Sequence, residues 1–160
     1  MRVTFCVNKS KVLDDVGRMT AYIGQRKVGD VGAFERISTT DSDNDMLEQF
    51  WLAACSAATD ILKHAVIDSK TSPDYKIVCE VSSLYDFDLT DSINDSLHNF
   101  FVTLMASKWC GITSPDDVKR LAEEAAGYAI DVNNKFYHRK MPQRLTTKDR
   151  NNELPQVHIY

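Results

Sequence analysis

The chain has 160 residues, about the size of one ordinary domain, with a hydrophobic share of 43% and a charged share of 26%. These values are near the average for folded proteins and exclude wholesale disorder. A chain of this length needs no disulfide or metal to fold. The net charge of −4 is too small to indicate a partner by itself.

Four cysteines without a CxxC pair favour free thiols in a reducing compartment. Cys55, Cys79 and Cys110 lie in apolar runs, where buried thiols are expected. The longest apolar stretch, residues 50–58, is too short to cross a bilayer, and early basic residues interrupt any apolar signal segment. We therefore expect a protein that is made and used in the cytoplasm, or one that is built into something assembled there.

The first forty residues predict a strand, a short helix and a loop. Residues 2–7 alternate between apolar and polar side chains, which is typical of a strand or an extended arm. A short helix is expected from Ser10, with its end at Gly24. Residues 25–40 predict a loop with a strand-like piece at 34–38. The helically spaced apolar residues of the short helix are Val12, Leu13, Val16, Met19 and Ile23.

The middle of the chain predicts a long helix followed by a strand. Thr40 or Asp41 can cap the helix, and the acids around this cap suit the positive end of the helix dipole. The helix should end near Asp68, before a serine–proline pair. Residues 75–82 then alternate and predict a strand. The apolar face of the helix is Leu47, Phe50, Trp51, Ala54, Ala58, Ile61, Leu62 and Ala65.

Two more long helices follow. The first is capped by Thr90 or Asp91 and should end at Gly111, a common helix terminator. The second opens at Ser114-Pro115 and should close near residue 140. Because the connection between them is so short, we expect these two helices to be antiparallel neighbours.

The predicted fold is mostly α: an antiparallel helical bundle of three long helices plus one short helix, with a small strand element and extended termini. We expect a single α-rich domain with an N-terminal arm over residues 1–142 and an extended basic C-terminal tail over residues 143–160. The paired aromatics are expected in the core, although some could serve a subunit interface instead. These aromatics are Phe50, Trp51, Phe100 and Phe101.

No pattern in the sequence predicts a catalytic, cofactor or metal site. Asp41, Asp43 and Asp45 match the start of a calcium loop, but Met46 and Leu52 replace the glycine and the bidentate acid that such a loop requires. Four histidines are scattered without a second ligand at metal-binding spacing. Glycine-rich phosphate loops, the nucleophile elbow and the zinc-protease motif are absent from the sequence. We therefore expect neither an enzyme nor a cofactor.

Charge is distributed unevenly along the chain. Residues 135–160 hold six of the 19 Lys and Arg and two of the 23 Asp and Glu, a net charge of +4, which leaves −8 for residues 1–134. This basic end either contacts phosphate or an acidic protein, or is a solvated helix end with a solubilising tail. The candidate partner contacts are Arg139, Lys140, Arg144, Lys148 and Arg150.

Two parts of the sequence resemble proteins of tailed bacteriophages. The stretches 9–16 (KSKVLDDV), 20–24 (TAYIG) and 34–41 (FERISTTD) resemble proteins encoded in structural gene clusters of phages and prophages of gut bacteria. Residues 89–111 are similar to the central helix of head–tail connector proteins. That helix is apolar and ends in a small residue and an aromatic, as Ala106 and Trp109 do here.

The resemblance implies a virion structural protein, a head–tail connector (adaptor) of the neck that forms a ring under the portal and joins head to tail. Its partners would be portal, neck and tail proteins and further copies of itself in a homo-oligomeric ring. Packaged DNA is a further candidate partner, and a membrane is not. The protein would assemble in the host cytoplasm and reside in the virion.

The alternative is a cytoplasmic binding or regulatory protein that contacts nucleic acid through its basic C-terminal end. A steep fall of DNA affinity with added salt would support it. An enzyme of an unfamiliar type is a third reading, and it would need a pocket in which titratable groups converge.

Overall fold

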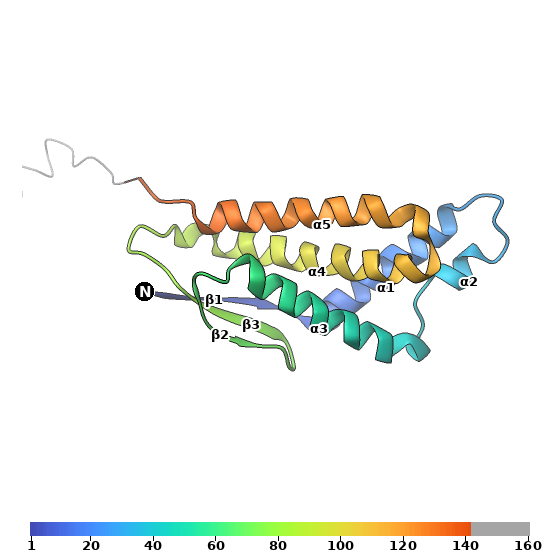
Figure 1. Cartoon of the computed structure of the whole chain (residues 1–160), viewed down its shortest axis with the longest axis horizontal. Helices are drawn as coiled ribbons and strands as arrows, with labels where there is room; N and C mark the ends of the chain where they lie inside the picture. The colour runs from blue at the N-terminus through green and yellow to red at the C-terminus, as the bar shows by residue number, and fades with distance from the viewer. Residues whose placement is uncertain (142–160) are drawn as a thin grey trace, which may run out of the picture.

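The computed structural model describes residues 1–141, which form a mostly helical body beside a small antiparallel sheet (Figure 1). The predicted fold class is confirmed. Within these residues, no helix is long and apolar enough to cross a membrane. The elements in chain order are β1 (Arg2–Val7), α1 (Lys9–Arg26), α2 (Ala33–Ile37), η1 (Asp41–Asp43), α3 (Asn44–Ile61), β2 (Val66–Lys70), β3 (Tyr75–Glu80), η2 (Phe87–Leu89), α4 (Thr90–Thr113) and α5 (Pro115–Phe136).

The sheet has the order β1-β3-β2, and both pairs are antiparallel. Strand β1 pairs with β3 along its whole length, from Arg2 opposite Glu80 to Val7 opposite Tyr75. Every second side chain of β1 and β3 is buried, as the alternation predicted. The buried face packs on the helices, with Phe5 in edge-to-face contact with Phe136 of α5.

Strand β2 was not predicted, because the helix before it was expected to reach Asp68. Helix α3 instead ends at Ile61, and the chain turns before β2 begins at Val66. Four of the five residues of β2 are exposed, so the strand lacks the alternation that marks a strand in a sequence. The pairing of β2 with β3 also shifts register between Val66 and Asp68, which makes this edge of the sheet irregular.

The first helix and the loop after it also differ from the prediction. Helix α1 has 18 residues, as many as α3, and it passes Gly24 and ends at Arg26. Gly24 is buried where α1 meets α2, and a Cβ there would lie 2.8 Å from the Cα of Phe34. The absent side chain therefore serves this close approach and not the end of the helix. The expected strand-like piece at residues 34–38 falls mainly in α2.

Helices α4 and α5 form the predicted antiparallel pair and lie side by side along the body (Figure 1). A single residue, Ser114, connects them, because α4 continues through Gly111 to Thr113. Pro115 begins α5, where its missing N–H has no helical partner to lose. The closeness of the two helices follows from this connection.

The main core lies between the sheet and helices α1, α3, α4 and α5. Its centre is a group of aromatics in tilted contact: the ring centroid of Phe101 lies 4.9 Å from that of Trp51 and 5.2 Å from that of Tyr75. The indole N–H of Trp51 donates to the backbone oxygen of Thr71 at 3.1 Å. A second apolar cluster joins α1 and α2 to α4 and α5, and it consists of Ile23, Ala33, Ile37, Ala106, Cys110 and Leu121.

All four cysteines are free thiols. Cys55, Cys79 and Cys110 are buried as expected, whereas Cys6 is exposed on the outer face of β1. Burial raises the pKa of Cys55 to about 12 and that of Cys79 to about 11. Burial also raises the pKa of Cys110.

Candidate functional site

The described part of the basic end lies against the segment that precedes α4. After α5 ends at Phe136, the chain runs beside this segment, with an isolated antiparallel bridge between Arg139 and Tyr85. The backbone N–H of Lys140 donates to the oxygen of Leu84 at 3.0 Å. The basic end is therefore attached to the body up to Lys140.

The two described candidate contacts, Arg139 and Lys140, point to different surroundings. The Lys140 ammonium lies 2.9 Å from Asp88 and 4.0 Å from Asp86, and the hydrogen bond to Asp88 raises the pKa of Lys140. The guanidinium of Arg139 lies 6.0 Å from the ring centroid of Tyr137 and donates to backbone oxygens. The side chains of Arg139 and Lys140 therefore do not converge on a common phosphate site. The other candidates lie outside the described residues: Arg144, Lys148 and Arg150.

A pocket of about 300 Å³ adjoins this end of the body, between the end of α5 and the start of β2. Its lining includes Phe136, Tyr137 and Arg139 from the chain end, and Val66 and Ile67 from the sheet edge. The pocket is mixed in polarity, and its lining also includes His64 and Glu80. It offers a shallow contact surface beside Arg139.

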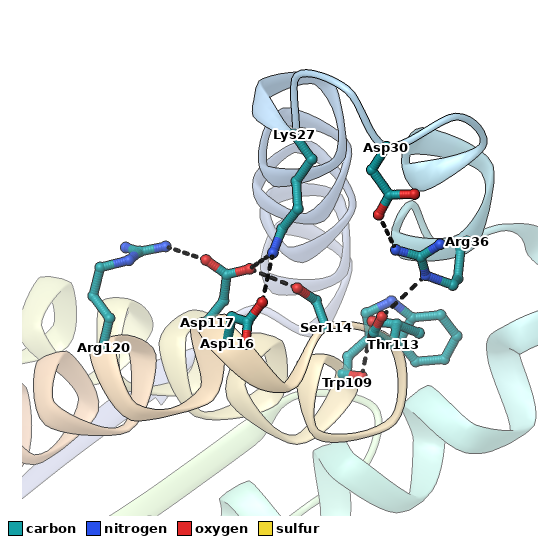
Figure 2. Close-up of polar contacts among 9 residues, drawn as sticks. All are labelled: Lys27, Asp30, Arg36, Trp109, Thr113, Ser114, Asp116, Asp117 and Arg120. Carbon is teal, nitrogen blue, oxygen red and sulfur yellow. Dashed lines mark hydrogen bonds and ion pairs between the residues drawn. The ribbon is translucent and has the colours of Figure 1, made fainter.

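A denser polar cluster lies at the far end of the body, where α1 ends and α5 begins (Figure 2). The ammonium of Lys27, directly after α1, lies 3.0 Å from Asp117 and 3.9 Å from Asp116. The hydroxyl of Ser114 donates to Asp117 at 2.7 Å, and the guanidinium of Arg120 lies 3.8 Å from the same carboxylate. Asp117 thus holds three elements of sequence together: the end of α1, the α4–α5 connection and the first turns of α5.

A second ion pair secures the neighbouring α1–α2 loop. Arg36 on α2 lies 2.6 Å from Asp30 in the loop, and its Nε donates to the backbone oxygen of Thr113 at 3.3 Å (Figure 2). The indole N–H of Trp109 donates to the oxygen of Ile37 at 2.6 Å. These contacts fix the loop and α2 on the end of α4.

A groove of about 790 Å³ runs between the end of α1 and the start of α5. Apolar side chains and cations share its walls, and Asp117 is its one carboxylate in the part of the chain that the structure describes. Val28 stands at its rim with 97% of its surface exposed. The lining is Met19, Tyr22, Ile23, Arg26, Lys27, Val28, Asp117 and Arg120.

The surroundings of Asp117 lower the affinity of its carboxylate for protons. Partial burial alone would raise the pKa of Asp117, but hydrogen bonds from Ser114 and Lys27 outweigh this effect and lower the pKa below its ordinary value. A lowered pKa stabilises the folded chain above the unfolded value of about 3.9, and this contribution is lost as the pH falls through the folded pKa.

We therefore expect Asp117→Asn to reduce the acid sensitivity of folding. The difference in unfolding free energy between pH 6 and pH 3 should shrink by about 0.5 kcal/mol, a value that allows for solvent screening. Urea unfolding at the two pH values measures it. Asp116→Asn is the matched control, because the side chain of Asp116 is 95% exposed. Equal effects of the two variants would contradict the assignment.

A contact between a histidine and an aspartate is the arrangement that an enzyme could use for acid–base chemistry. His98 on α4 lies 2.7 Å from the carboxylate of Asp15 on α1, and a shallow pocket of about 290 Å³ beside it also contains the exposed Cys6. No hydrogen bond joins the Cys6 sulfur to His98 within residues 1–141. The histidine–aspartate contact connects α1 to α4 and accounts for the position of both side chains.

No group of three or more potential metal ligands occurs in the part of the chain that the structure describes. Comparison with known protein families, with curated proteins and with solved structures finds no match.

The groove was not predicted from the sequence, because its residues come from segments about ninety positions apart that each look ordinary. A partial signal is present: Val28 and Val31 are apolar residues in a glycine-containing loop, where polar residues are usual. In the structure the two valines are 97% and 100% exposed.

Proposed function

We propose that the chain is a virion structural protein, a head–tail connector of the neck that acts by binding other subunits. The observation that carries this proposal is the exposed apolar loop between α1 and α2, with Val28 and Val31 in contact with solvent. Large apolar side chains that are exposed together on one loop are typical of surfaces that another protein covers.

The shape of the molecule is compatible with a ring subunit. Helices α3, α4 and α5 make an elongated body, with the α1–α2 loop at one end and the exit of the chain after Met141 at the other (Figure 1). A body with different contact surfaces at its two ends can join different neighbours. The resemblance to the central connector helix, residues 89–111, falls on α4, whose buried residues span almost its entire length.

The pairing of Lys140 with Asp88 and Asp86 weakens the case for nucleic-acid binding through this side chain. A cation that already has carboxylate partners gains less from a phosphate than an unpaired one, because binding must first break the existing contacts. The nucleic-acid alternative would therefore depend mainly on residues outside the described part of the chain.

The test is cross-linking of the tagged full chain in a phage-producing culture, followed by affinity purification and mass spectrometry. We expect portal, tail or other neck proteins among the cross-linked partners, with cross-links from the α1–α2 end and the chain-exit end to different neighbours. A sample that contains only nucleic acid or host proteins would overturn the connector proposal. A sharp fall in DNA binding as salt is added would then support the regulatory alternative.

A further inference from the structure

We propose that the groove between α1 and α5 receives the acidic start of α3 from a second copy of this chain. This inference rests on the proposed function. In a ring, each copy uses one face to contact one neighbour and a different face to contact the other.

One of the three cations that line the groove has no carboxylate partner within residues 1–141. Arg26, Lys27 and Arg120 contribute three cations to its lining, against the single carboxylate of Asp117. Lys27 is paired with this carboxylate, and Arg120 is paired with it and with Glu124. The guanidinium of Arg26 instead lies 5.0 Å from the ring centroid of Tyr22. Within residues 1–141 no carboxylate lies in salt-bridge range of Arg26. Arg26 is therefore available to an acidic partner.

The groove also offers apolar surface that the folded chain leaves uncovered. Met19 and Ile23 line its floor, and the side of Tyr22 and nearly all of Val28 remain exposed at the rim. Burial of such surface by another chain lowers the free energy of the complex. An occupant with both acids and apolar side chains fits this groove best.

The start of α3 has this composition. Asp45, Met46, Gln49 and Leu52 lie within one stripe of the helix, because residues three, four and seven apart share a face. Met46 and Leu52 are 39% and 49% exposed, and Asp45 is exposed beside them. Among the described residues no cation pairs with Asp45, so its charge is available.

The two faces lie on different sides of the body. Figure 1 shows α3 along one long edge and α5 along the other, with α4 between them. One copy therefore cannot place its own α3 start in its own groove without unfolding. A contact between two different faces leaves one groove and one α3 start open on every pair, so it repeats and closes into a ring when the rotation permits.

The test is a charge exchange in the full chain. Arg26→Glu and Asp45→Arg should each raise the dissociation constant of self-association by roughly tenfold or more, because each places like charges in contact. The double variant with both changes should return to within a few-fold of the natural chain. Analytical ultracentrifugation over a range of concentrations measures all three, and circular dichroism checks that each variant is folded.

Lys119→Glu and Asp60→Arg are the controls, since they reverse exposed charges outside both faces, on α5 beside the groove and on α3. The proposal is overturned if the natural chain stays monomeric at every concentration, if the single reversals leave association unchanged, or if the double variant fails to recover. In the last case Arg26 and Asp45 do not face each other in the contact between copies.

The cross-linking and the charge exchange can contradict the proposed function and the α3 contact separately. Cross-links to portal or tail proteins without the charge-exchange pattern would overturn only the α3 contact. Self-association with the charge-exchange pattern but without virion partners would overturn the connector role and leave the contact in place.

Discussion

Replacement of Trp51 by alanine should destabilise the fold by about 3–5 kcal/mol, the range for a large aromatic removed from a packed core. Trp51 is fully buried on α3, contacts Phe101 of α4 and donates a hydrogen bond to Thr71 before β3. The variant therefore loses the ring contact with Phe101 and leaves the backbone oxygen of Thr71 without this donor. Urea unfolding followed by circular dichroism measures the loss.

Ile130→Ala is the control for this experiment, because Ile130 lies on α5 with 62% of its surface exposed. Its effect should stay within about 0.5 kcal/mol, as for other surface changes. If Trp51→Ala cost no more than Ile130→Ala, α3 could not be packed on α4 and the sheet in the way described.

Two glycine-to-alanine changes should shift stability in opposite directions. Alanine is favoured over glycine inside a helix by about 1 kcal/mol, so Gly127→Ala in α5 should stabilise the chain, since a Cβ there meets nothing within 4 Å. Gly24→Ala should instead destabilise it by about 1–3 kcal/mol, because the new Cβ would lie 2.8 Å from the backbone of Phe34. Thermal unfolding of the two variants shows the sign of each change.

This pair of variants tests the docking of α2 on α1 specifically. A stabilising effect at both positions would mean that α1 and α2 do not approach each other closely. The end of α1, which lines the groove, would then not be held in the described position. A destabilising effect at Gly127 would mean that α5 has a neighbour on that side.

The elements that the sequence predicted well carry strong local signals. The α4–α5 pair was predicted because Ser114 and Pro115 mark a helix start directly after an apolar helix, and β3 because its alternation is regular. Local chemistry decides these elements, so a single sequence contains the necessary information.

The elements that were missed depend on tertiary contacts. Strand β2 exists because β3 offers it an edge, while its own residues 67–70 are exposed and show no periodicity. Gly24 was read as a helix end from a general rule, although here it allows two helices to touch. The basic end was identified, but the pairing of Lys140 with Asp88 across 52 residues has no local signal.

The four thiols allow local unfolding of the chain to be measured by the rate at which they are alkylated. Thiolates react and thiols do not, so burial and a raised pKa together protect Cys55, Cys79 and Cys110 from alkylating reagents in the folded state. Cys6 is accessible on β1 and should be modified first. A fluorophore can therefore be attached at one known place without mutation, beside α4 and away from the groove. The slower modification of the remaining three then measures how often α3, the sheet and α4 open to solvent.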